Sequence, residues 1–155
     1  MAAALPHTWR PRRGRIVCYT ISAVLLVITA VIALLLPHEG AFVFSVGDRI
    51  GVFAFAVGIS WFLHKHASVK VVAQSDGLLV VNLFRRRTLA WGEVLAVRLR
   101  PGDPWTYLDL SDGETIAAMG IQASDGAAAV ESARELARLV RTLTPDLPAG
   151  SGSDR

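Results

Sequence analysis

The side chains that most often carry catalysis are few in this sequence, and their spacing matches no known catalytic motif. His64 and His66 flank Lys65, but no third metal ligand is nearby and the lysine charge repels cations. No nucleophile elbow, phosphate-binding loop or metalloprotease motif is present. Three acidic residues surround an Asp-Gly turn signal, where solvated side chains are expected: Asp109, Asp112 and Glu114. We therefore expect no catalytic site, no metal and no cofactor, and predict that the protein is not an enzyme.

The composition divides the chain into an apolar basic part and a nearly neutral part. The 155 residues are 52% hydrophobic and 19% charged, whereas soluble domains have about 25% charged residues. Residues 1–66 hold six basic and two acidic residues, a net charge of +4, and residues 67–155 hold ten and eleven, a net charge of −1. A nucleic-acid-binding domain carries its own basic surface, so we expect no nucleic acid partner. The single cysteine, Cys18, excludes a disulfide framework.

Two apolar runs predict a helical hairpin in a membrane. Residues 16–36 contain 21 residues without a charge, about 31 Å of helix, which matches the hydrocarbon thickness of a bilayer. The run exceeds the apolar region of a signal peptide and lacks a small-residue cleavage site. Residues 50–63 are shorter, so a re-entrant or interfacial segment is the alternative to a second crossing. Asp48 can cap this helix and Trp61 suits the interface, which favours a crossing.

The arginine and lysine distribution predicts the orientation of the hairpin. The leader HTWRPRRGR holds four arginines, the connector 37–49 holds one at its end, and basic residues return at Lys65 and Lys70. The positive-inside rule then places both termini in the cytoplasm. We expect a multi-pass protein of the cytoplasmic membrane, with the bilayer as its first partner and PHEGAFVFSV outside.

Small residues recur every four positions near the second apolar run. Such spacing allows two helices to approach closely, either within the hairpin or between protomers. The residues of this predicted helix-packing face are Gly47, Gly51, Ala54 and Gly58.

After residue 67 the pattern changes to short strands separated by turn signals. Asp76-Gly77 and Asp112-Gly113 are typical of hairpin turns. Strands at spacings of about 8–12 residues predict an antiparallel sandwich or barrel. We expect six of them, over residues 68–74, 78–84, 89–91, 94–100, 105–111 and 114–121, with RRRT (85–88) as a polar connection.

One amphipathic helix follows the predicted strands. Ser124 is the expected N-cap, Asp125 lies in the first turn, and Pro145 ends the helix. Leu136 and Val140 should close one end of the barrel. The full apolar stripe is Val130, Ala133, Leu136, Ala137, Val140 and Leu143.

The order of strands followed by one helix is that of the pleckstrin-homology (PH) superfold. Three segments resemble the bacterial PH domain of small actinobacterial membrane proteins, a family that includes low molecular weight protein antigen 6. They are DGLLVVNLFRRRTLAWGEV (76–94), WTYLDLSDG (105–113) and AMGIQASDG (118–126). The resemblance implies a PH-like fold. It says little about activity, because one fold carries many functions.

The resemblance also bears on lipid recognition. Lipid-reading PH domains place basic residues in their first hairpin, but here that hairpin is VVAQSDGLLVV, which has none. Phosphoinositide recognition is therefore not expected. Trp91, Trp105 and Tyr107 are interpreted as packing residues. The candidate lipid or partner contacts are five arginines elsewhere in the domain: Arg85, Arg86, Arg87, Arg98 and Arg100.

The predicted organisation has four parts: a basic cytoplasmic leader (1–15), a transmembrane helical hairpin (16–66), a PH-like domain (67–144) and a disordered tail (145–155). The function we expect is a non-enzymatic interaction module at the cytoplasmic membrane face. It binds a protein partner or its own copy, as an accessory subunit of a membrane complex for example. The alternative is a domain that senses anionic lipid or organises the membrane.

Overall fold

The computed structural model describes residues 5–35 and 44–144. The predicted tail (145–155) and residues 37–43 of the predicted outer connector lie outside the described residues. The chain divides into two compact units. One unit contains residues 12–68, and the other combines residues 1–11 with residues 69–155.

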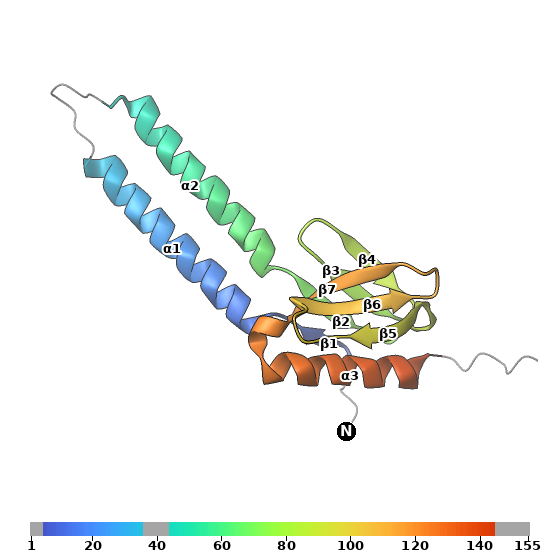
Figure 1. Cartoon of the computed structure of the whole chain (residues 1–155). Coiled ribbons are helices and arrows are strands. Elements are labelled where there is room, and N and C mark those ends of the chain that lie inside the picture. Colours follow the sequence, from blue (N-terminus) through green and yellow to red (C-terminus); the bar gives the residue numbers. More distant parts are fainter. Residues whose placement is uncertain (1–4, 36–43, 145–155) are drawn as a thin grey trace, which may run out of the picture. The chain divides into compact units, whose positions relative to one another are not determined.

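The first unit is a pair of long apolar helices, α1 (Arg12–Leu35) and α2 (Val46–Ala67), shown in blue and green in Figure 1. Their 24 and 22 residues correspond to about 36 and 33 Å of helix. Both are long and apolar enough to cross a membrane. Helix α2 is longer than its apolar run because a capping box starts it: Asp48 N donates to Ser45 Oγ, and Ser45 N donates to the Asp48 carboxylate at 2.8 Å. The predicted capping role of Asp48 is confirmed.

The predicted small-residue face of α2 lies only partly beside α1. A Cβ added to Gly51 or Gly58 would meet nothing within 4 Å, so these two glycines do not mediate packing of α2 on α1. Ala54 lines an apolar groove together with Ala30 and Ala33 of α1. Gly47 sits in the first turn, close to the Ser45 hydroxyl. Packing of this face against another protomer stays a prediction.

The second unit is formed by two antiparallel sheets and one helix (Figure 1). The first sheet has the order β1-β2-β3-β4 and the second the order β5-β6-β7. This arrangement confirms the expected antiparallel sheets followed by a C-terminal helix. The strands are β1 (His7–Trp9), β2 (Lys70–Ala73), β3 (Leu78–Val81), β4 (Arg86–Leu89), β5 (Val94–Arg98), β6 (Trp105–Leu110) and β7 (Thr115–Gln122). Helix α3 spans Ala127–Leu143 and two 3-10 turns span Trp91–Glu93 and Ala123–Asp125.

Strand β1 comes from the segment that the sequence analysis assigned to the leader. It pairs with β2, with Trp9 opposite Val71, although the two helices separate these residues in the chain. The Trp9 ring is only 6% exposed, and its Nε1 donates to Glu135 of α3 at 3.0 Å. The leader is therefore part of the folded domain at residues 7–9, and the helical pair is the connection between the first two strands of a sheet.

Two local predictions were wrong. Arg86 and Arg87 belong to β4 rather than to a polar connection, because the β3–β4 hairpin extends to the pair Val81 and Arg86. Ser124 does not cap α3, because it lies in the second 3-10 turn and Gly126, with φ of +66°, precedes the helix. A positive φ is accessible to glycine without steric cost.

The core fills the space between the two sheets and α3. Leu136 and Val140 are buried there, as predicted, while Val130 of the predicted stripe is 42% exposed. Trp91 is also buried, which confirms its predicted packing role, and Glu93 of the first 3-10 turn accepts from the Ala90 amide at 2.6 Å. The helix residues buried in this core are Ala129, Ala133, Leu136, Leu139 and Val140.

A candidate binding pocket between β4 and β7

The inner face of the β3–β4 hairpin changes from apolar to polar along its length. Leu78 and Leu89 form a buried cross-strand pair. The next pair on the same face is Val80 and Arg87, since cross-strand neighbours two residues on share a face. Arg85, two residues before Arg87, is at the polar end of this face. The guanidinium groups of Arg87 and Arg85 therefore come directly after the buried apolar pairs on this face of the hairpin.

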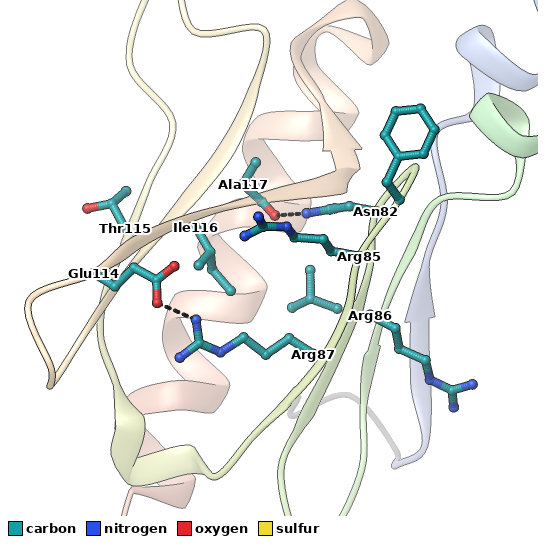
Figure 2. A pocket seen from close by; sticks show the side chains of 10 residues that line it. Asn82, Arg85, Arg86, Arg87, Glu114, Thr115, Ile116 and Ala117 are labelled. Atoms are coloured by element: carbon teal, nitrogen blue, oxygen red, sulfur yellow. Dashed lines mark hydrogen bonds and ion pairs between the residues drawn. The ribbon is translucent and has the colours of Figure 1, made fainter.

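A pocket of about 530 Å³ lies where these arginines face β7. We call it the β4–β7 pocket. Figure 2 shows the side chains of Arg85 and Arg87 on the same side as Ile116, whereas that of Arg86 is directed away. The pocket is lined by Val80, Asn82, Phe84, Arg85, Arg86, Arg87, Glu114, Thr115, Ile116 and Ala117. It therefore combines apolar side chains with cationic and amide groups, as ligand sites commonly do.

The Asn82 amide closes one end of the pocket by bonding to the backbone of β7. Its Nδ2 donates to the Ala117 carbonyl at 2.7 Å (Figure 2), and its Oδ1 accepts from the Met119 amide at 3.1 Å. Both bonds resemble those that a neighbouring strand would make. A backbone edge of β7 therefore faces the pocket, and Asn82 covers only part of it.

Arg87 closes the opposite side through ion pairs with the β6–β7 turn. Its Nη1 lies 2.5 Å from Glu114 Oε2 and its Nη2 lies 3.4 Å from Asp112 Oδ2. The hydrogen bond to Glu114 raises the pKa of Arg87. Two of the three acidic residues that the sequence analysis interpreted as solvated turn residues, Asp112 and Glu114, thus hold this arginine in place.

Arg85 and Arg86 are exposed, and neither side chain has a hydrogen bond or ion pair within residues 5–35 and 44–144. Phe84, which precedes them, is 82% exposed. Arg85 is the cation of this pair whose side chain lies on the pocket side.

The remaining two candidate arginines do not line the pocket: Arg98 is the last residue of β5, and Arg100 lies in the loop that follows it. Arg98 holds Asp109 through both Nε and Nη2, each at 2.5 Å. These bonds, and one from the Thr115 hydroxyl, lower the pKa of Asp109. The Arg100 amide donates to Asp103 at 2.7 Å. The structure therefore brings Arg85 and Arg87 together in a site and does not bring Arg98 or Arg100 to it.

Most of the pocket is absent from the sequence prediction, which named only its three arginines as candidate contacts. The missed residues are Val80, Asn82, Phe84, Glu114, Thr115, Ile116 and Ala117. No local motif connects them, because they come from β3, the hairpin loop and β7. The only signal was the run of three arginines within a chain segment rich in β-forming residues.

Comparison with known proteins gives the class of this domain. Residues 68–139 match the bacterial PH domain family. PH domains are generally interaction modules without catalytic activity, which agrees with the polar groups and apolar floor of the pocket.

Two relatives match almost the whole chain and define its family. The uncharacterised proteins Rv1417 of Mycobacterium tuberculosis and Mb1452 of Mycobacterium bovis are each 31% identical over 152 residues, which cover 94% of this chain and 98% of theirs. The chain therefore belongs to a family of bacterial PH domain proteins that includes these two. The shared region is long enough to include α1 and α2. No solved structure matches the chain significantly.

Proposed function

We propose that the protein is an interaction module anchored in the cytoplasmic membrane by α1 and α2, and that its β4–β7 pocket binds a protein partner or a second copy of the chain. The observation that carries this proposal is the Arg85 guanidinium, which has no partner in the described residues and adjoins the apolar floor of Val80 and Ile116. A ligand with an anionic group and an apolar part would pair with the guanidinium and cover the apolar floor.

The pairing of β1 with β2 supports a hairpin that enters and leaves the membrane on one side. Trp9 precedes α1 by only three positions, and Lys70 follows α2 by three, yet both strands belong to one sheet. When two consecutive helices each cross a bilayer, the start of the first helix and the end of the second helix lie on the same side of the membrane. The arginines of the leader favour the cytoplasm as that side. Both termini would then be cytoplasmic.

Anionic lipid is the second candidate ligand, and Phe84 is the observation that favours it. The ring is 82% exposed beside Arg85 and Arg86. An exposed Phe ring can be buried at the boundary between headgroups and acyl chains, and each arginine near an anionic leaflet contributes about 1 kcal/mol of attraction. In this alternative, the loop that precedes β4 would contact headgroups and orient a domain that the helices already anchor.

Site-specific photocrosslinking in native membranes tests the main proposal. Thr115, on the pocket rim, is replaced by a benzophenone amino acid, and Arg134, exposed on α3, is replaced in the same way as a control. We expect a heavier crosslinked species from position 115 and none from position 134, and we expect Arg85→Glu to abolish it. A species of twice the chain's mass would identify self-association. Recovery of the monomer alone from both positions would overturn the proposal.

A further inference from the structure

Strand β7 has a free backbone edge that continues into the β4–β7 pocket. It is the last strand of its sheet and pairs with β6 on one side only. The Leu110 amide donates to the Glu114 carbonyl at 2.8 Å, so these two residues form a hydrogen-bonded pair at the turn between β6 and β7. Along an antiparallel ladder such pairs alternate with pairs whose backbone amides and carbonyls point away from the partner strand. Thr115 and Ala117 belong to the outward set. The Asn82 side chain donates to Ala117 O and accepts from Met119 N, which agrees with this direction.

The open part of this edge is short and lies within the pocket. Asn82 bonds to the Ala117 carbonyl and the Met119 amide, and at Gly120 β7 approaches the backbone of Val71 too closely for a side chain. The Thr115 backbone and the Ala117 amide have no strand partner among the residues that the structure describes. Unpaired strand edges are the usual template for the addition of another strand.

The side chains around this edge select for an acidic segment. In an extended ligand, side chains alternate between two faces, so every second residue faces the inner side of the pocket. There it meets the apolar Val80 and Ile116 and the guanidinium of Arg85. Arg87 is already neutralised by Glu114 and Asp112, which leaves Arg85 as the cation available to a ligand carboxylate.

We propose that the β4–β7 pocket binds an extended acidic peptide segment of a protein partner, which adds as a strand to the β7 edge at Thr115 and Ala117 and places a carboxylate on Arg85. This inference rests on the proposed function and specifies its ligand. Backbone bonds to β7 would supply affinity, and Arg85 would supply the preference for acidic residues.

The test uses the full chain in detergent micelles and a blocked seven-residue peptide of alternating Glu and Val as the probe. Binding is followed by fluorescence anisotropy, and backbone contact by hydrogen–deuterium exchange. We expect slower exchange of the Thr115 and Ala117 amides when the peptide binds. We also expect loss of binding when the central residue is proline, which has no amide for pairing, and when lysine replaces glutamate.

Two exposed arginines give matched variants. Arg85→Glu should weaken binding by about tenfold or more, as expected for a lost charge-assisted hydrogen bond replaced by repulsion. Arg134→Glu makes the same charge change on α3, at a residue that does not line the pocket, and should weaken binding less than threefold, about the effect of a screened surface charge. Intrinsic tryptophan fluorescence verifies that both variants are folded.

Four results would overturn the inference: no peptide binding at millimolar concentration, equal binding of the proline peptide, unchanged exchange at Thr115 and Ala117, or equal effects of the two arginine variants. Displacement of the peptide by phosphatidylglycerol added to the micelles, but not by phosphatidylcholine, would favour lipid as the ligand instead. These failures differ from failure of the proposed function. A crosslink from position 115 that requires Arg85, without peptide binding, would leave the proposed function standing and reject strand addition.

Discussion

The indole Nε1 of Trp9 donates a hydrogen bond to the carboxylate of Glu135 at 3.0 Å, across 126 positions of the chain. The bond joins β1, which precedes both long helices, to α3, which follows all of the strands. His7 Nε2 lies 3.6 Å from the same carboxylate. The N-terminal segment is therefore fastened to the domain by its sheet pairing, by the buried ring and by this polar contact.

Replacing Trp9 with alanine should destabilise the domain strongly. The ring is almost fully buried, and removal of a buried aromatic side chain costs about 3–5 kcal/mol in free energy of unfolding. Trp9→Phe retains most of the apolar volume and removes the hydrogen bond, so its loss should be smaller. Chemical denaturation of the purified full chain measures both. Equal stability of Trp9→Ala and the wild-type chain would contradict the observed burial.

A domain that begins at Val69 should be incomplete, because it lacks β1 and exposes the edge of β2. We expect it to unfold at a lower temperature than the same unit in the full chain. A synthetic peptide of residues 1–11 should raise its melting temperature in proportion to peptide binding, whereas the peptide with Trp9→Ala should not. No response to the native peptide would show that β1 is dispensable.

Gly120 should not tolerate a side chain. A Cβ at this position would lie 2.5 Å from the Val71 backbone nitrogen and 2.6 Å from the Lys70 carbonyl carbon, so the crossing of β7 over β2 would have to open. Overpacking of this kind costs about 1–3 kcal/mol. Gly92→Ala is the matched control, because its Cβ would meet nothing within 4 Å. Denaturant midpoints that fall equally for the two variants would reject this account of the crossing.

The Arg98–Asp109 pair should make stability depend on acid. The hydrogen bonds from Arg98, and then that from Thr115, hold the pKa of Asp109 below its ordinary value of 3.8. A carboxyl group with a lowered pKa stabilises the folded state above its ordinary pKa, and this contribution is lost as the pH falls through the folded-state pKa.

The variant Asp109→Asn should therefore melt at a lower temperature than the wild-type chain at pH 7, and the gap should shrink below about pH 4. Thermal unfolding across this range measures it. A gap that persists unchanged at low pH would mean that the carboxylate charge is not responsible.

Local patterns predicted most of this fold, and tertiary pairing explains what they missed. Strand spacing and turn signals predicted β5 and β6, and the Asp-Gly turns predicted two hairpins, because each signal lies within a few adjacent residues. Strand β1 has three residues and its partner Val71 lies beyond both helices, so no local pattern can indicate it.

Strand β4 was not predicted within the arginine run, again because the residue that stabilises it lies far away in the chain. Three consecutive cations favour a solvated loop, but Arg87 faces the inner side of the hairpin because Glu114, 27 positions later, neutralises it. The pocket itself depends on β3, β4 and β7 meeting. The sequence could therefore indicate Arg85 and Arg87 as contacts but could not separate them from Arg98, which is bound to Asp109.

Cysteine labelling in intact cells tests the membrane arrangement that underlies the proposed function. In a chain with Cys18→Ser, single cysteines are placed at the exposed positions Phe44, before α2, and Ser111, in the β6–β7 turn. A membrane-impermeant maleimide should label position 44 in intact cells and position 111 only in inverted vesicles. Labelling of position 111 from outside intact cells would contradict the proposed cytoplasmic domain.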